Sequence, residues 1–395
     1  MDRHSEKTDL PSAPGISDQR AQRLQKLDEL KERGVAPYGC RTDDTTATNI
    51  ACAEFEAGAA TEDRELTLAG RITAKRKMGK SIFADLRDQS GRLQLYVQKN
   101  RVGQDEFDVF VSLDIGDMIV ATGTMFQTRT GETSLRVSTF KLAAKALRPL
   151  PEKWHGLTDV EQRYRQRYLD LISNPDVHAL FMKRFEIVRR LRAFLDQKGF
   201  LEVETPMLQP IAGGAAARPF KTHYTALDCP MYLRIAPELY LKRLLVGGFE
   251  RIYEINRNFR NEGLSRHHNP EFTMVEVYQA HGDCHAMMDL VEELVTTLAQ
   301  DVLGSLKVES ENGAVIDLTP PWRRVPYAEL IKAEVGDDWF EIDNAERVKR
   351  ARALNLDVLD DMAEVQITHE VYEKVIEGSL IQPTFVTRLP ASLVP

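Results

Sequence analysis

One stretch of the chain, Phe249 to Tyr278, contains two strand-like segments joined by a polar loop. Successive side chains of a strand point to opposite faces, so residues of one parity share a face. One face of the first segment mixes an apolar residue with polar and charged ones: Ile252, Glu254, Asn256, Asn258 and Arg260. The matching face of the second carries Phe272, Met274, Glu276 and Tyr278. Ionisable groups among large apolar ones are costly unless they are paired or meet a charged ligand. We therefore expect this hairpin to form the floor of a site for a charged, ring-bearing substrate.

The size and composition are typical of a soluble globular protein with two or three domains. The chain has 395 residues, of which 43% are hydrophobic and 28% charged. No apolar run approaches the ~18 residues that a membrane-spanning helix needs. The N-terminal sequence MDRHSEKTDLPSAPG lacks the apolar core of a signal peptide. A cytoplasmic protein without a membrane segment is expected.

Cysteine usage and net charge further limit the kind of protein that this chain can be. The four cysteines contain no CxxC pair, which favours reduced thiols: Cys40, Cys52, Cys229 and Cys284. A net charge of −8 argues against a general nucleic-acid coat protein but permits a local binding surface. The run RITAKRKMGK, from Arg71 to Lys80, has five basic residues in ten. Either a solvated face or a nucleic-acid contact would explain it.

The N-terminal half divides into three segments. Residues 1–16 are polar and are expected to be disordered. Residues 17–63 are expected to be mainly helical, with a first helix from Ser17 to Arg33. Residues 64–146 show five short strand patterns separated by glycine-bearing turns, which predicts a five-stranded barrel of the OB type. The alternation alone would also allow another small β domain.

The C-terminal half begins after a linker, residues 147–176, and residues 177–395 form the second large domain. A long amphipathic helix is expected from Val177 to Gly199. The segment FLEVETPML that follows is expected to be a strand, with Pro206 at an edge or a bend. Without further context this is an ordinary helix–strand unit.

Several motifs carry a resemblance to a known family. Phe259-Arg260-Asn261-Glu262 resembles motif 2 of the class II aminoacyl-tRNA synthetases. The surrounding RIAPELYLKRLLVGGFERIYEINRNFRNEG and HHNPEFTMVEVY resemble the lysyl-tRNA synthetases of that class, and the likeness runs from about residue 17 to the end. It implies an α+β protein: an N-terminal anticodon-binding OB barrel, then a catalytic core of antiparallel sheet flanked by helices. The helix, strand and Pro206 resemble motif 1, which implies a homodimer.

The resemblance implies a lysine–tRNA ligase that uses ATP and Mg²⁺. Such an enzyme joins L-lysine to AMP with release of pyrophosphate and then transfers lysine to the 3′ end of tRNA(Lys). This chemistry depends on positioning and on cations that stabilise phosphate charge. The planar guanidinium of Arg260 suits that role and matches motif 2. An ion pair with Glu254 or Glu262 is the structural alternative for Arg260.

Further ATP-binding residues follow from the same resemblance: Glu262, His268, Asn269 and Phe272. Phe272 would stack on adenine, although packing in the core would also explain an aromatic residue there. The pair His267-His268 and the group His281, Cys284 and His285 could suggest metal sites. Neither has the spacing of a convincing set of ligands, so we expect no metal at either place.

Lysine recognition requires carboxylates close to the substrate ammonium groups. The residues implied by the resemblance are Gly214, Glu238, Glu276 and Tyr278. Gly214 would permit close backbone approach to the substrate. Glu238 follows Pro237, so it could instead serve as a carboxylate at a helix N-terminus, a role compatible with ligand contact. The Ala236–Tyr240 run APELY favours lysine over the substrates of the aspartyl and asparaginyl relatives.

An anticodon-binding surface needs an aromatic ring for base stacking and polar groups for base edges. The resemblance assigns these roles to Arg76, Phe83, Gln94 and Glu132. Packing inside the barrel is the alternative for Phe83.

The sequence departs from the family pattern at its C-terminal end. It stops at Pro395, inside what is expected to be an apolar strand, and no glycine-rich motif 3 occurs in it. We expect a fragment with an uncovered sheet edge, without the second ATP-binding arginine and without the family's Mg²⁺ ligands. Arg388 stands where an acidic residue is frequent in the family. Two alternatives stay open: a paralogue that charges a protein or a different tRNA, and a tRNA-binding or regulatory module without catalytic activity.

Overall fold

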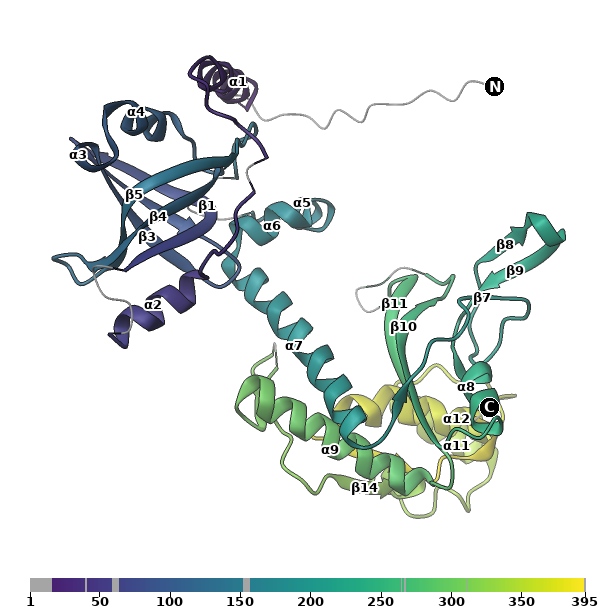
Figure 1. The fold of residues 1–395 in the computed structure, drawn as a ribbon. Coiled ribbons are helices and arrows are strands. Elements are labelled where there is room, and N and C mark those ends of the chain that lie inside the picture. The colour runs from purple at the N-terminus through teal and green to yellow at the C-terminus, as the bar shows by residue number, and fades with distance from the viewer. Residues whose placement is uncertain are drawn as a thin grey trace. The chain divides into compact units, whose positions relative to one another are not determined.

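The computed structural model describes residues 16–39, 41–58, 64–151, 157–263, 265, 268–310 and 312–393 (Figure 1). The expected disordered stretch, Cys40, His267 and most of the linker sequence KWHGL therefore lie outside the described residues, apart from Ile16 and Leu157. The chain forms two compact units, Met1–His178 and Ala179–Pro395.

The first unit is built on a closed five-stranded barrel with the strand order β1-β2-β3-β5-β4. Its strands are β1 (Glu65–Met78), β2 (Ser81–Arg87), β3 (Arg92–Gln98), β4 (Met118–Gln127) and β5 (Thr133–Ala144). Buried and less buried residues alternate along β2, and the buried ones fill the barrel together with Leu68, Ile72, Leu95 and Val137. A Cβ on Gly123 would lie 2.1 Å from the carbonyl oxygen of Arg136, so this position allows β4 and β5 to approach. The expected barrel is confirmed.

Helices surround the barrel within the same unit. They are α1 (Ile16–Glu32), α2 (Thr48–Glu56), α3 (Lys99–Val102) and α4 (Gln104–Ser112). The helix expected from Ser17 to Arg33 therefore begins and ends one residue earlier. The segment expected to be a linker contains two short helices, α5 (Val160–Arg165) and α6 (Arg167–Ser173). Asp170 of α6 is fully buried and accepts hydrogen bonds from Arg163 and Asn174.

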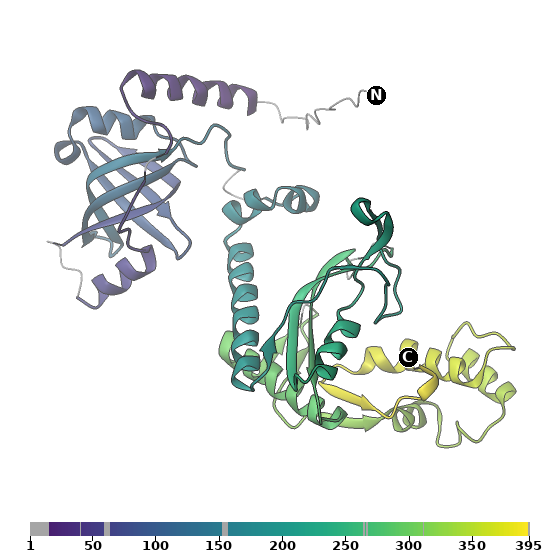
Figure 2. The same ribbon diagram turned by 45° about the vertical axis from the view of Figure 1, so that its right-hand side comes forward.

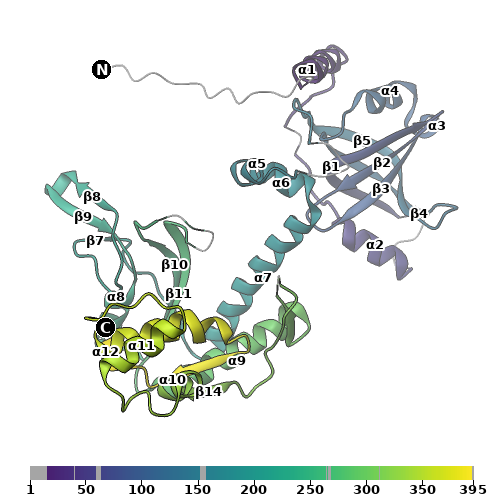
Figure 3. The same ribbon diagram turned by 180° about the vertical axis from the view of Figure 1, so that it is seen from behind.

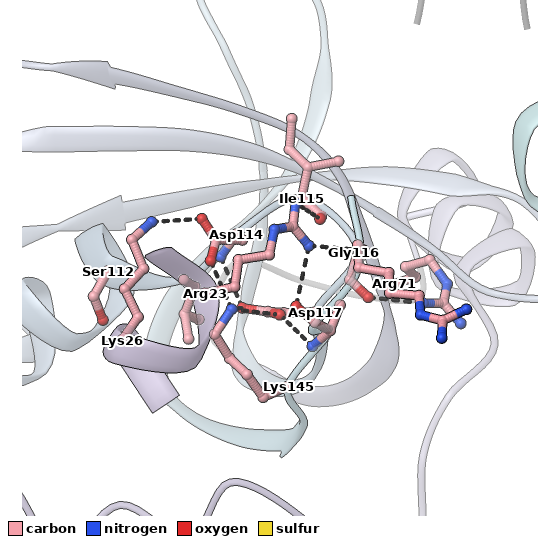
Figure 4. Close-up of polar contacts among 12 residues, drawn as sticks. Arg23, Lys26, Arg71, Ser112, Asp114, Ile115, Gly116, Asp117 and Lys145 are labelled. Atoms are coloured by element: carbon pink, nitrogen blue, oxygen red, sulfur yellow. Dashed lines mark hydrogen bonds and ion pairs between the residues drawn. The ribbon is translucent and has the colours of Figure 1, made fainter. Parts of the chain in front are cut away.

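A buried ion cluster joins α1 to the barrel (Figure 4). The Lys145 ammonium has no exposed surface and lies 2.7 Å from a carboxylate oxygen of Asp114 and 3.0 Å from one of Asp117. Lys26 of α1 also reaches Asp114, at 2.6 Å. Arg23 of α1 donates to the backbone carbonyls of Ile115, Ala146 and Arg148. Burial raises the pKa of Asp114, but the hydrogen bonds from Lys145 and Lys26 outweigh this effect and leave the pKa below its usual value.

The second unit contains a long β-hairpin between helices. Helix α7 (Pro175–Gln197) enters it and is followed by a short strand, β6 (Leu201–Glu202), which pairs in parallel with β10 (Arg251–Phe259). β10 pairs along its whole length with β11 (Glu271–Gln279), and α8 (Glu238–Val246) contacts both strands (Figure 2). The segment FLEVETPML is not one continuous strand: it has strand structure at Leu201–Glu202 and again at its last residue, Leu208. After Glu202 the chain turns away, and Thr205 hydrogen-bonds with Glu254 of β10.

A second small sheet precedes α8. Its strands follow the order β7-β9-β8, with β7 at Leu208–Gln209, β8 at Lys221–Tyr224 and β9 at Cys229–Leu233. The turn η1 (Thr225–Leu227) joins β8 to β9. Arg234, directly after β9, links this sheet to the hairpin, because its N–H donates to Met207 and its carbonyl accepts from Phe259.

One face of the hairpin packs on helices. Phe194 and Leu195 of α7 form a core with Tyr253 of β10, and Ile255 and Val277 pack against it. Helix α9 (Cys284–Leu303) adds Leu290 and Leu294 to the same core. The opposite parity of β10 and β11 is therefore left to face away from α7 and α9.

The C-terminal part of this unit has its own core around the buried Trp339. Figure 3 shows its helices grouped beside β14. Its elements are β12 (Lys307–Glu309), β13 (Val315–Asp317), β14 (Arg323–Pro326), α10 (Tyr327–Val335), α11 (Asn344–Ala353), α12 (Glu364–Val371), η2 (Tyr372–Ile376), η3 (Glu377–Ser379), β15 (Thr384–Thr387) and η4 (Ala391–Leu393). β15 pairs in parallel with β14 and ends at Thr387, so the expectation that the chain stops inside a strand is wrong. Leu389-Pro390 follows Thr387, and Pro390 has no N–H to continue a strand ladder.

Among the described residues, no helix has both the length and the apolar character needed to cross a bilayer.

The ion cluster predicts a large effect of Lys145 on the stability of the barrel. Lys145→Met should lower its free energy of unfolding by about 3–5 kcal/mol, because Asp117 would be left buried without its cation. Native-state hydrogen exchange of the β4 and β5 amides measures this loss. Lys31→Met is the matched control, since Lys31 pairs with Asp28 on the exposed side of α1, and it should change stability by less than about 0.5 kcal/mol. Equal effects of the two variants would contradict a buried ion cluster that supports the fold.

Candidate functional site

The register of β10 and β11 places the predicted polar residues on one face. Glu254 lies opposite Glu276, Asn256 opposite Met274, and Asn258 opposite Phe272. Cross-strand partners share a face. The other parity is the one that packs on α7 and α9. The predicted separation of the two parities is therefore what the structure shows: one parity forms the core face and the other carries the candidate site residues.

Two of the four residues assigned to lysine, Glu276 and Tyr278, lie at the acidic end of this face, and the other two, Glu238 and Gly214, lie against each other on α8 and on the segment before it. Tyr278 donates a hydrogen bond of 3.0 Å to Glu276. Glu238 is the first residue of α8 and forms an ion pair of 2.5 Å with Lys242, one turn further along the helix. Gly214 has a φ of +89°, and a Cβ there would lie 3.0 Å from the Cβ of Glu238. A side chain at this position would be strained and crowded, so glycine suits close backbone approach.

The electrostatics of this end favour a cationic ligand. Burial raises the pKa of Glu276; the hydrogen bond from Tyr278 opposes that rise, while Glu238 and Glu254 add to it. Burial also raises the pKa of the Tyr278 hydroxyl, and the charges of Glu276 and Glu238 add to that rise. Carboxylates that raise the pKa of a neighbouring carboxyl group form a site that binding of a cation would stabilise.

The opposite end of the face carries Arg260 and Phe272. The Arg260 guanidinium lies 5.2 Å from the centroid of the Phe272 ring, a cation–π contact. Within the described residues, no ion pair joins Arg260 to a carboxylate, and its buried Nε has no acceptor. Glu254, one of the partners considered for Arg260, pairs instead with Arg234 at 2.6 Å. Arg260 is therefore held by an aromatic ring and keeps donors for a ligand.

Unpartnered buried polar atoms concentrate at this face. Among the described residues, seven buried side-chain atoms lack a hydrogen-bond partner, and three of them belong to Arg234, Asn258 and Arg260. Such atoms are rare in native structures and are normally satisfied by a ligand or water. Parity along the strand predicts that Asn258 lies on this face but indicates no role for it, and no pattern in the sequence marks Arg234.

The loop residues assigned to ATP are exposed. Glu262 and Asn269 lie at its two ends, and Nδ1 of His268 is 2.8 Å from Oγ of Ser265. Among the described residues, none of these three side chains forms a hydrogen bond or an ion pair with Arg260. Nowhere in the described parts of the chain do three or more His, Cys, Asp or Glu residues form a group that could hold a metal ion.

A second candidate surface lies on the barrel. A surface hollow of about 820 Å³ is lined by Arg76, Phe83, Gln94 and Glu132 together. Phe83 stacks on Tyr96 with ring centroids 4.8 Å apart. Its neighbours Ile82 and Ala84 fill the barrel interior instead, so the alternative of Phe83 as a barrel-core residue is excluded.

The hollow also contains residues that the sequence analysis missed. Tyr96 and Phe126 lie 5.6 Å apart, and the Arg136 guanidinium lies 4.4 Å from the Phe126 centroid. Alternation in β3 places Tyr96 on the same face as Gln94, which is the signal that could have identified it.

The basic run from Arg71 to Lys80 is divided between two roles. Arg71 donates to the carbonyl of Gly116, and the half-buried Lys75 donates to the carbonyls of Val111, in the last turn of α4, and Leu113, directly after it. Burial lowers the pKa of Lys75 to about 8. Arg76 lines the hollow. Only part of the run is therefore available to a ligand.

The fold and the two surfaces define a class of protein. Residues 66–143 match the family model described as an OB-fold nucleic acid binding domain, and residues 159–395 match the model of the class II tRNA synthetases (D, K and N). The second match covers more than half of the chain. The chain therefore belongs to the class II tRNA synthetase family.

Within this class the chain is similar to proteins named lysine–tRNA ligase. It is 52% identical to that of Carboxydothermus hydrogenoformans over 374 residues, which is 94% of this chain and 76% of the relative. It is 52% identical to that of Pelotomaculum thermopropionicum over 378 residues, covering 94% and 74% of the two chains. It is 46% identical to that of Staphylococcus aureus over 387 residues, covering 96% and 78%. The predicted resemblance is confirmed, and a non-catalytic tRNA-binding module is not favoured.

Proposed function

We propose that this protein is a lysine–tRNA ligase, which activates L-lysine with ATP and transfers it to the 3′ end of tRNA(Lys). The observation that carries the proposal is the division of the hairpin face into an acidic end and an arginine end. Lysine has two ammonium groups and one carboxylate, and ATP brings phosphate charge to the same reaction. The class of the chain and the names of its relatives support this function.

Arg260 is the residue that we assign to catalysis. The lysine carboxylate attacks the α-phosphorus, the bond to pyrophosphate breaks, and negative charge develops on the α-phosphate oxygens. A guanidinium with unpaired donors can bind such oxygens bidentately. Phe272 holds the guanidinium from one side and offers its ring to adenine. Glu262, His268 and Asn269 complete the assigned ATP contacts from the loop.

Mg²⁺ belongs to the proposal as a companion of ATP. This cation is commonly held by one or two carboxylates together with substrate phosphates. The described residues do not supply a group of three or more ligands.

The acidic end accounts for lysine recognition. Glu238 and Glu276 supply the carboxylates, Tyr278 orients Glu276 through its hydrogen bond, and Gly214 allows the substrate to lie against the backbone. In this structure Glu238 is paired with Lys242. A bound substrate ammonium group would replace the Lys242 ammonium group as the partner of Glu238.

The barrel hollow accounts for anticodon binding. The Phe83 ring offers a stacking surface, while Arg76, Gln94 and Glu132 offer polar groups for bases and phosphates. In this structure Glu132 is paired with Arg92 at 2.7 Å, and Gln94 accepts a hydrogen bond from Ser134 at 3.0 Å. These partners orient the two side chains.

A homodimer is also part of the proposal. Helix α7 exposes a row of large apolar side chains, including Leu180 at 64% and Phe185 at 58%. Exposed apolar patches of this kind mark association surfaces. The match of this helix and Pro206 to motif 1 supports a second copy of the chain as the partner.

The domain boundaries proposed here are 17–63, 64–146, 147–176 and 177–395. The separation of the structure into units at His178 and Ala179 supports the last boundary. A cytoplasmic location is proposed from the function, since charging of tRNA serves translation.

Arg260→Ala should slow lysyl-adenylate formation roughly 10²–10³-fold, the usual cost of removing one fixed donor to transition-state charge. ATP–pyrophosphate exchange measures the rate, and filter binding should show unchanged tRNA affinity. Arg257→Ala is the matched control, because Arg257 lies on the same strand with the other parity and pairs with Glu271 at 3.6 Å. ATP–pyrophosphate exchange at the wild-type rate in Arg260→Ala would contradict the catalytic role assigned to Arg260.

Glu238→Gln should raise the KM for lysine roughly 10- to 100-fold and leave the KM for ATP unchanged, since a hydrogen bond to a charged group contributes about 1.5–3 kcal/mol. Steady-state exchange kinetics separate the two constants. Lys242→Met is the control: it removes the internal partner of Glu238, so lysine should bind at least as well. An unchanged KM for lysine in Glu238→Gln would refute the role of this carboxylate.

Phe83→Ala should weaken tRNA(Lys) binding by about 1–3 kcal/mol, the typical contribution of one stacked base. Adenylate formation should be unaffected. Tyr38→Ala, which removes another exposed aromatic of the same unit outside the hollow, should leave binding unchanged. If both variants bind tRNA like the wild type in a filter assay, the hollow is not the anticodon surface.

A further inference from the structure

The buried ion pair of Arg234 and Glu254 lies beside the acidic end of the hairpin face. The Arg234 side chain has no exposed surface and that of Glu254 has 1%. Arg234 donates from Nη1 to Glu254 at 2.6 Å and from Nε to the carbonyl of Arg257 at 2.8 Å. Glu254 also accepts from Thr205, through the N–H at 3.2 Å and the hydroxyl at 2.7 Å. Both charged groups are thus fixed by several contacts.

Glu254 destabilises the ionised form of the neighbouring Glu276 carboxylate. It is the direct cross-strand partner of Glu276, and like charges placed opposite each other on a sheet repel. Four charged or titratable groups act on Glu276 in the ligand-free protein: Tyr278 of β11, Glu254 of β10, Glu238 of α8, and Arg234 before α8. Arg234 is the only cation among these four.

The charges of the face then match those of the substrate. Arg234 neutralises Glu254; once a substrate ammonium group replaces Lys242 as the partner of Glu238, Glu238 and Glu276 are the carboxylates left for the substrate and Arg260 is the cation. Lysine carries two ammonium groups and one carboxylate. A third uncompensated carboxylate would break this match and would favour a protonated Glu276 over an ionised one.

We propose that Arg234 is a positioning residue for substrate selection: by pairing with Glu254 beneath the face, it keeps Glu276 ionised and available to a substrate ammonium group. This inference rests on the proposed function for the identity of the substrate. The electrostatic relation of Arg234, Glu254 and Glu276 is a property of the ligand-free protein. It can therefore be tested separately.

The experiment measures the pKa of Glu276 in the full 395-residue chain without ligand. Glutamate labelled with ¹³C at the side-chain carboxyl is followed by NMR from pH 3 to 9, and the spectrum of Glu276→Gln assigns the signal. Arg234→Gln should raise the pKa of Glu276 by about 1 unit, the lower end of the effect of a nearby charge. Glu254→Gln should shift it in the opposite direction, because Arg234 is then left without its counter-charge.

Two further variants separate charge from structure. Arg234→Lys keeps the cation and should keep the pKa of Glu276 close to the wild-type value. The double variant Arg234→Gln with Glu254→Gln removes both charges and should return the pKa most of the way to that value. If Arg234 had only a structural role, Arg234→Gln and Glu254→Gln would shift the pKa of Glu276 in the same direction. That result would overturn the proposal, and so would an unchanged pKa of Glu276 in Glu254→Gln. The measurement on Glu254→Gln can be made even if Arg234→Gln does not fold.

Calorimetric titration with lysine as a function of pH provides the functional readout. In Arg234→Gln the affinity should fall about 10-fold relative to the wild type at pH values below the raised pKa. At high pH, where Glu276 is ionised in both proteins, the affinities should converge. A wild-type chain that does not bind lysine would contradict the proposed function, whereas the pKa shifts would still decide the role of Arg234.

Discussion

The alternation of side chains along the β10–β11 hairpin is the constraint on which the rest of the catalytic unit depends. One parity carries Tyr253, Ile255 and Val277 into the core formed with α7 and α9. The other parity carries Glu254, Glu276 and Arg260 away from that core. Because the side-chain period of a strand is two, a shift of one residue in register would exchange the faces completely. The apolar core therefore fixes the positions of the charged groups that the two strands contribute to the site.

Buried ion pairs play a comparable part in both units. Lys26 of the N-terminal helix pairs with Asp114, which is held in turn with Asp117 by the buried Lys145, and Arg234 with Glu254 joins the small sheet to the hairpin. Such pairs contribute little net stability compared with apolar residues of the same size, because desolvation offsets their attraction. What they do provide is a fixed charge at a fixed place. Beside a substrate-binding face, a fixed cation can keep a substrate-binding carboxylate ionised.

Much of this arrangement could be predicted from local patterns. Parity alone predicted the site face, and short alternating segments with turns predicted the barrel that contains Phe83. Both predictions depend on neighbours within one or two elements. The same local logic failed for the segment FLEVETPML, where pairing with β10 ends at Glu202 and Thr205 hydrogen-bonds with Glu254 instead. No local sequence pattern indicated Arg234, because its ion-pair partner Glu254 lies twenty residues further along the chain. The basic run was ambiguous for a similar reason: the carbonyls that hold Lys75 come from residues 110–113.

The central claim is that two net carboxylates and one guanidinium on the hairpin face select an amino acid with a cationic side chain. Calorimetric binding of lysine and of norleucine, which has the same carbon chain without the ε-ammonium group, tests this claim most directly. A site built for a buried polar group rejects the analogue that lacks it by a factor on the order of 10⁴. We therefore predict measurable binding of lysine and none of norleucine over the same concentration range. Equal affinity for the two would mean that the carboxylates of this face do not recognise the side chain, and the account would fail.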